Sequence, residues 1–115
     1  MEAKASESGL PEDCCNAIVL RRVYHHLSDA AATNASLFRA LRPGGLLAVI
    51  DFPPPPLFGR GSLGVPVQEV VDELTARGFH MVRLSTDWPG RGPLGTYCVL
   101  LRKPLPHAGM IATPV

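Results

Sequence analysis

The sequence has no long hydrophobic run, no concentration of charge and few cysteines. Its apolar stretches fall well short of the roughly 20 residues that cross a bilayer, and the N-terminus MEAKASESG has no apolar core for a secretory signal. The net charge is +1 and the Lys and Arg residues are scattered, so charge points to neither nucleic acid nor a membrane as a partner. We therefore expect a cytoplasmic protein.

The cysteine and histidine spacings indicate neither a disulfide framework nor a metal site. The three cysteines are Cys14, Cys15 and Cys98, an odd number with two adjacent, as expected of a reducing compartment. His25 and His26 are also adjacent. Adjacent pairs lack the Cys-x-x-Cys type of spacing that lets two ligands converge on one tetrahedral zinc ion. We expect no bound metal.

The first half of the chain predicts a βαβ unit. Two apolar runs, from Asn16 to Leu20 and from Leu46 to Asp51, show no alternation of polar and apolar residues, which is typical of parallel strands buried on both faces. The apolar positions of residues 30–41 share one stripe of a helix, and residues 42–45 predict a sharp reversal. We expect helices on each side of the sheet.

The second half predicts one helix followed by two antiparallel strands. Pro66 suits the first position of a helix that Gly78 ends. Strands at residues 80–85 and 96–101 have a loop and no helix between them, so they can pair only as antiparallel neighbours without a crossover. We expect one domain over residues 1–103 and a disordered tail over residues 104–115, where proline is frequent and periodicity is weak.

Two segments, DCCNAIVLRRVYHHLSDAA and LFRALRPGGLLAVIDF, resemble the later motifs of class I S-adenosylmethionine-dependent methyltransferases, the type 11 group in particular. In that family a fourth strand that opens with Asp-Ala-Val is followed by an HHL turn, a helix, an L(R/K)PGG motif and a fifth strand with an acidic end. The resemblance covers residues 10–104. It implies an α/β fold with the C-terminal half of a Rossmann-like methyltransferase sheet: two parallel strands, an antiparallel hairpin and two main helices.

The resemblance leaves the earlier motifs of the family without a counterpart. The family binds its cofactor between the first and fourth strands, and this sequence has neither the glycine-rich turn nor the acidic residue of the second strand. The strand from Asn16 to Leu20 would then form an open edge, which invites association. We expect a fragment of a methyltransferase that is inactive alone. The alternatives are a non-catalytic interaction module, pairing through this edge with itself or another protein, and a remnant without function.

The resemblance also implies where S-adenosylmethionine would bind. In the family a small-residue pair lies along the adenine ring, and here that pair is Lys4 and Ala5. Ala5 fits, whereas Lys4 replaces an acidic or amide group. The backbone carbonyl of Arg21 corresponds to the family position that meets the amino group of the cofactor's methionine part.

Three further residues are candidates for contact with a small-molecule methyl acceptor. Arg22 would face an anionic substrate or remain a solvated side chain. His25 is either a base near the acceptor or a packing residue, since the adjacent His25 and His26 cannot both face the crevice. Asp51 would contact substrate or fix the next loop. No catalytic residue is assigned, because methyl transfer depends mainly on alignment of the acceptor.

Overall fold

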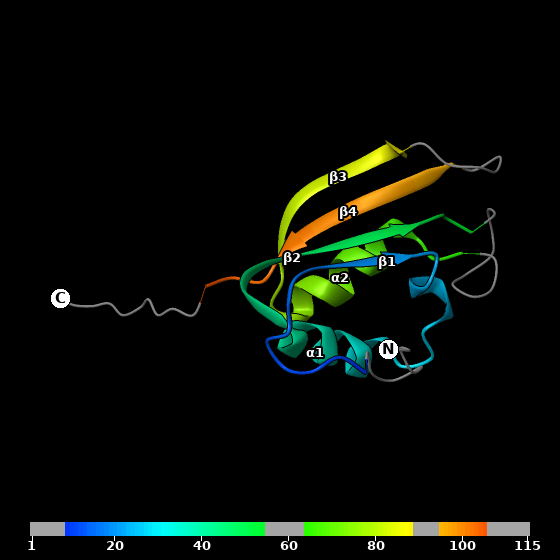
Figure 1. The fold of residues 1–115 in the computed structure, drawn as a ribbon. Helices are drawn as coiled ribbons and strands as arrows, with labels where there is room; N and C mark the ends of the chain where they lie inside the picture. The colour runs from blue at the N-terminus through cyan, green and yellow to red at the C-terminus, as the bar shows by residue number, and fades with distance from the viewer. Residues whose placement is uncertain (1–8, 55–63, 89–94, 106–115) are drawn as a thin grey trace.

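The computed structural model describes residues 9–54, 64–88 and 95–105. The elements are, in chain order, β1 (Cys15–Arg21), the 3-10 turn η1 (Tyr24–His26), α1 (Ala30–Ala40), β2 (Leu41–Asp51), α2 (Val67–Arg77), β3 (His80–Trp88) and β4 (Thr96–Arg102). They form one sheet with both helices beneath it (Figure 1). Within the described residues, no helix is both long and apolar enough to cross a membrane.

The four strands lie in the order β1-β2-β4-β3. β1 and β2 are parallel, with Leu20 opposite Val49 and Arg21 opposite Ile50. β4 is antiparallel to both β2 and β3. The prediction of two parallel strands beside an antiparallel pair is confirmed, and β1 forms one edge of the sheet.

The helix boundaries follow from local capping. The Asp29 side chain accepts a hydrogen bond from the Ala32 amide at 3.0 Å and so caps the first turn of α1. α2 starts directly after Pro66, which is the N-cap residue rather than the first helical one. Gly78 ends α2 with φ of 120°, a backbone angle that glycine adopts without a steric penalty.

The predicted reversal at residues 42–45 lies within the segment assigned to β2, where Gly44 has φ of 84°. α1 ends at Ala40 and β2 begins at the next residue. The register between β1 and β2 then slips, because Cys15 lies opposite Leu41 whereas Ala17 lies opposite Leu46. The extra residues bulge toward the end of β4, so the chain enters the regular strand without a separate loop.

Both helices cover the same face of the sheet, so the expectation of helices on each side is wrong (Figure 1). The crossovers from β1 to β2 and from β2 to β3 join parallel strands and run in the same direction across the sheet. Since such crossovers are almost always right-handed, their helices fall on one face. Val19, which lines the uncovered face, is accordingly 61% exposed.

The hydrophobic core lies between this helix pair and the inner face of the sheet. Its central side chains are fully or nearly fully buried and come from β2, β4, α1, α2 and the link between α2 and β3. They are Leu47, Val49, Val99, Leu101, Leu37, Val70, Leu74 and Phe79.

The structure joins Cys14 and Cys15 in a disulfide, contrary to the expectation from their spacing. Cys98 is a free thiol, half-buried on β4, and burial raises its pKa.

Candidate functional site

The carboxyl ends of β1 and β2 meet at one rim of the sheet, which we call the rim site. Arg22 leaves β1 with φ of 59°, in the left-handed region, while its amide donates to the Ile50 carbonyl at 2.7 Å. The peptide bond before it is trans, so the Arg21 carbonyl points opposite to the Arg22 N–H and therefore away from β2. The Arg21 carbonyl, a hydrogen-bond acceptor, is thus directed toward the flank of β1 along which no described strand lies.

The next turn brings His25 onto Asp51, the last residue of β2. The carboxylate accepts hydrogen bonds at both oxygens: from the His25 amide at 3.1 Å, from the Phe52 amide at 2.9 Å, and at 2.8 Å from the ring nitrogen Nδ1 of His25. Asp51 is 0% exposed and His25 is 5% exposed. The two residues form a buried dyad at the end of the parallel pair.

The ring of His25 is held by packing as well as by Asp51. Its centroid lies 4.0 Å from that of His26 and 4.8 Å from that of Phe52. Asp51 occupies Nδ1, and among the described residues Nε2 has no hydrogen-bond partner.

A second hydrogen-bonded group fixes the turn that carries His25. The Tyr24 hydroxyl donates to Glu73 Oε1 at 2.7 Å and accepts from Asn34 Nδ2 at 2.9 Å. Tyr24 is 0% exposed and Asn34 is 1% exposed. The turn is therefore tied to both α1 and α2, which limits movement of the neighbouring histidine.

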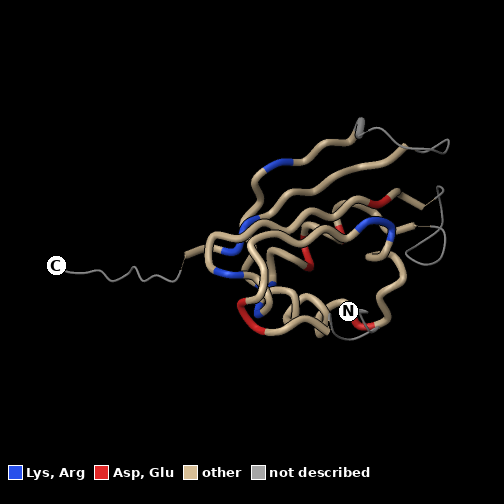
Figure 2. The backbone as a smooth tube through the Cα atoms, viewed as in Figure 1, with Lys and Arg blue, Asp and Glu red and all other residues tan. Residues whose placement is uncertain are grey.

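The charges at the rim site are of both signs. Figure 2 shows basic residues at the end of β1 and an acidic residue at the end of β2. Arg21 and Arg22 have exposed side chains, whereas Asp51 is enclosed. The charge accessible to a ligand is thus positive.

Of the residues singled out from the sequence, the structure brings four together and leaves one outside. Arg21, Arg22, His25 and Asp51 all lie at the rim site. Ala5, with Lys4, falls outside the described residues. The dyad was not predicted as a pair, although each member follows one of two parallel strands, and such strand ends adjoin.

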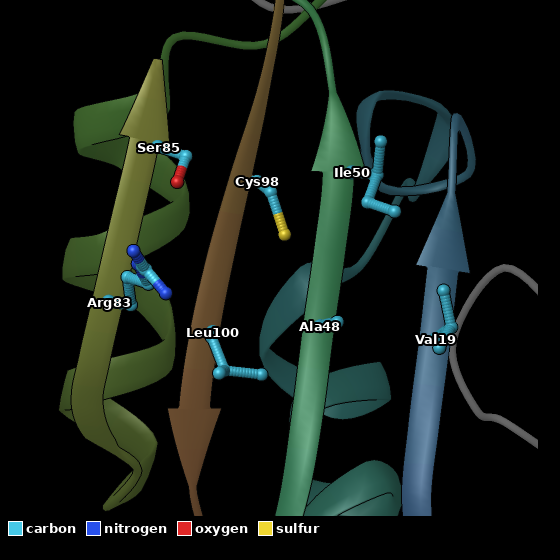
Figure 3. Close-up of a pocket in the computed structure, with 7 residues that line it drawn as sticks. All are labelled: Val19, Ala48, Ile50, Arg83, Ser85, Cys98 and Leu100. Atoms are coloured by element: carbon cyan, nitrogen blue, oxygen red, sulfur yellow. The ribbon is translucent and has the colours of Figure 1, made fainter. Parts of the chain in front are cut away.

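A groove on the open face of the sheet was not predicted. It has a volume of about 520 Å³ and is lined by one residue of β1 and two each of β2, β3 and β4 (Figure 3). They are Val19, Ala48, Ile50, Arg83, Ser85, Cys98 and Leu100. The groove lies beside the rim site and does not include the dyad. In the described ranges, no three His, Cys, Asp or Glu residues gather as a metal site would require.

The architecture defines the class of protein. Right-handed crossovers that ran outward from β1 would place their helices on the open face. The described strands have the arrangement of one half of a doubly wound α/β sheet, with β1 at the edge and parallel to β2.

Comparison with known proteins finds methyltransferases with similar sequences. Residues 1–49 match the methyltransferase domain model of the type 11 group. Demethylmenaquinone methyltransferase of Thermus thermophilus is 32% identical over 65 residues, which are 56% of this chain and 28% of that protein.

Solved structures agree on the fold. A S-adenosylmethionine-dependent methyltransferase from Aquifex aeolicus matches with a TM-score of 0.70 and 20% identity, over 90% of this chain and 53% of its own. The 1,6-didemethyltoxoflavin-N1-methyltransferase of Burkholderia thailandensis, with 1,6-didemethyltoxoflavin and S-adenosylhomocysteine bound, matches with a TM-score of 0.67 and 19% identity, over 90% and 50%. The chain is thus similar to S-adenosylmethionine-dependent methyltransferases, in sequence over part of its length and in fold over most of it. It spans 28% of the curated relative.

Proposed function

We propose that the chain is part of an S-adenosylmethionine-dependent methyltransferase of a small-molecule acceptor, with the cofactor bound along the free flank of β1. One observation carries the proposal: the Arg21 carbonyl is directed outward at the carboxyl end of a parallel edge strand. Open α/β sheets bind ligands at that place, outside the strand ends where strand order reverses.

The residues present fit one part of the cofactor. The ammonium group of its methionine part needs an acceptor, and the Arg21 carbonyl supplies one at the correct side of β1. When bound, the cofactor would supply a methyl group already activated by the sulfonium. The sheet described here ends at β1, so further contacts to the cofactor would have to come from elsewhere, with Ala5 the candidate beside adenine. We therefore expect the isolated chain to be inactive.

The acceptor side of the proposal involves Arg22, His25 and Asp51. The exposed guanidinium of Arg22 suits an anionic group on the acceptor. The similarity to an enzyme that holds 1,6-didemethyltoxoflavin supports a small-molecule acceptor. A cytoplasmic location stays a prediction.

A second function is favoured by a different observation. β1 is an edge strand, and Val19 at its centre is 61% exposed beside an apolar groove. An edge of this kind can accept a strand from a second copy or from another protein. The chain would then be an interaction module without methyl transfer.

Calorimetric titration with S-adenosylhomocysteine separates the two functions. The chain is compared with a form that is extended upstream through any in-frame codons. Binding by the extended form supports the methyltransferase. A monodisperse dimer that binds no cofactor in either form contradicts it and supports the interaction module.

A matched ligand tests the Arg21 contact itself, which no side-chain variant can remove. 5′-Methylthioadenosine keeps the nucleoside and sulfur of S-adenosylhomocysteine but lacks the amino acid. If the Arg21 carbonyl holds the ammonium group, methylthioadenosine will bind the extended form more weakly. Equal affinity for the two ligands would contradict the proposed position of the cofactor.

A further inference from the structure

We propose that Cys14 and Cys15 are a reversible redox-modification site, which a low-molecular-weight disulfide such as glutathione disulfide closes and thiols reopen. The inference is independent of the proposed function, because it concerns the start of β1 and not the rim site at its end. It begins from the bond between the two adjacent sulfurs. In the closed form this bond completes a ring at the entrance to β1, of which Cys15 is the first residue.

The bond joins residues that are too close in the sequence for a structural crosslink. A disulfide restrains the unfolded chain more strongly as the loop that it closes becomes longer. Here the sequence separation is 1, so the two cysteines are already held together by their peptide bond. A crosslink between neighbours therefore restrains the unfolded chain least. The fold does not depend on this bond, and both redox states can share it.

The pair is within reach of small thiols. Both cysteines are only half-buried, and the residues on either side, Asp13 and Asn16, are exposed. Exposed disulfides are the labile ones, whereas the structural disulfides of secreted proteins resist reduction by the glutathione pool. In a reducing compartment, which the cysteine count indicates, the pair would be open at rest and closed after oxidation.

The third cysteine is not a partner of this pair. Cys98 pairs with Ile50 near the end of β2. Cys15 pairs with Leu41, which is the first residue of β2, so the two sulfur sites lie near opposite ends of that strand. Burial also raises the pKa of Cys98, so less of it is thiolate, the form that attacks a disulfide. Cys98 thus stays a thiol and is an internal reference for the pair.

The modification proceeds by two thiol–disulfide exchanges. One cysteine thiolate attacks glutathione disulfide, which forms a protein–glutathione S–S bond and releases one glutathione. The second cysteine thiolate attacks the protein sulfur of that mixed disulfide, so the bond between Cys14 and Cys15 forms and a second glutathione leaves. Two electrons pass to glutathione disulfide, and the two protein thiol protons end on the two glutathione molecules. Reduced glutathione reverses both steps.

Closure of the ring orders the entrance to β1. The segment around the pair is held to the end of α1, where the Asp13 amide donates to the Arg39 carbonyl at 2.8 Å. Arg42 contacts both flanks of the pair, since its Nε donates to the Asp13 carbonyl at 3.1 Å and its Nη1 to Asn16 Oδ1 at 3.4 Å. The ring removes side-chain rotation between these anchors. The closed form is therefore the more ordered one at this end of β1.

A thiol count in glutathione redox buffers tests the modification. Samples are equilibrated, quenched with acid and alkylated, and the alkylated thiols are counted by intact mass. We expect three thiols per chain in reduced glutathione and a loss of two in excess glutathione disulfide. Cys98→Ser, which leaves only the pair, should show the same loss without bound glutathione. A pair that stays closed in reduced glutathione, stays open in excess glutathione disulfide or keeps glutathione attached would overturn the proposal.

Single variants separate ring closure from simple attachment of glutathione. In the Cys98→Ser background, Cys14→Ser leaves one cysteine, which should gain one glutathione in excess glutathione disulfide and keep it. Cys15→Ser is the reciprocal change and should behave alike, so a folding defect in one variant does not decide the result. Loss of the remaining thiol without added glutathione, in a monomeric sample of either variant, would contradict closure within the pair.

Amide hydrogen exchange tests the structural effect of closure. The Asp13 amide, which is bound to Arg39, should exchange several-fold faster in the reduced form, whereas the Val99 amide at the centre of the sheet should not change. The double variant Cys14→Ser, Cys15→Ser should exchange fast at Asp13 in both buffers, which excludes an effect of the buffer itself. Equal exchange at Asp13 in the two forms would overturn the proposal. Fast exchange at Val99 on reduction would make the bond structural and would overturn it as well.

Discussion

Replacement of Asp51 by Asn tests the buried dyad with little change in volume. The carboxylate accepts from two backbone amides and from the ring of His25, and it is 0% exposed. An amide has a single acceptor oxygen, so in either orientation one buried N–H loses its acceptor, at about 1–3 kcal/mol. The hydrogen bond to the ring is kept in either orientation but loses its charged acceptor, which lowers its contribution by about 1 kcal/mol. We expect the free energy of unfolding to fall by about 2–4 kcal/mol.

Urea unfolding followed by circular dichroism measures this loss. With an m-value of about 1–3 kcal/mol/M, the midpoint should move by about 1 M or more, and an osmolyte such as sucrose brings a weakly folded variant into range. Asp72→Asn is the control, because Asp72 is exposed on α2 and its carboxylate accepts a hydrogen bond from the Gln68 side chain at 2.8 Å. It should change stability by less than about 0.5 kcal/mol. A loss below about 1 kcal/mol for Asp51→Asn would refute the reasoning.

Three further changes probe the turn, the bulge and the open face. Tyr24→Phe removes the hydroxyl that Asn34 Nδ2 contacts at 2.9 Å, so urea unfolding should show a loss of about 1–3 kcal/mol; an unchanged midpoint would contradict the network. Gly45→Ala would place a Cβ 2.8 Å from the Arg42 carbonyl, and a lower melting temperature is expected; an unchanged one would disprove the close approach. Burial raises the pKa of Cys98, so iodoacetamide, which reacts with the thiolate, should label it more slowly than free cysteine at neutral pH and faster as pH rises; labelling at the free rate would count against burial.

The elements were predictable from the sequence because their signals are local. The apolar runs at β1 and β2, the proline and glycine that bracket α2, and the direct link from β3 to β4 each depend on neighbouring residues. The strand and helix types and the antiparallel pairing were therefore correct. The reversal before Leu46 was predicted, whereas the pairing of Leu41 with Cys15, which extends β2 across a bulge, was not.

The arrangement of the layers and the pairing of His25 with Asp51 were harder to predict from the sequence. A continuous apolar run indicates burial on both faces, but it does not tell which segment covers which face, and here both helices fall on one. His25 and Asp51 were each considered for substrate contact, yet their pairing depends on a turn of three residues, η1, that no periodicity marks. The adenine candidate Ala5 remains a prediction.

Amide hydrogen exchange in β1 tests the central claim, a free flank at the strand that would face the cofactor. The Arg22 amide donates a hydrogen bond to β2. Because the amides of a strand point alternately to its two sides, those of Ile18 and Leu20 also point toward β2. In a sample shown to be monomeric, these should be strongly protected, whereas the amides of Val19 and Arg21 should exchange nearly as fast as in an unstructured peptide. Equal protection of both sets would mean that the flank is already covered, which would contradict the account.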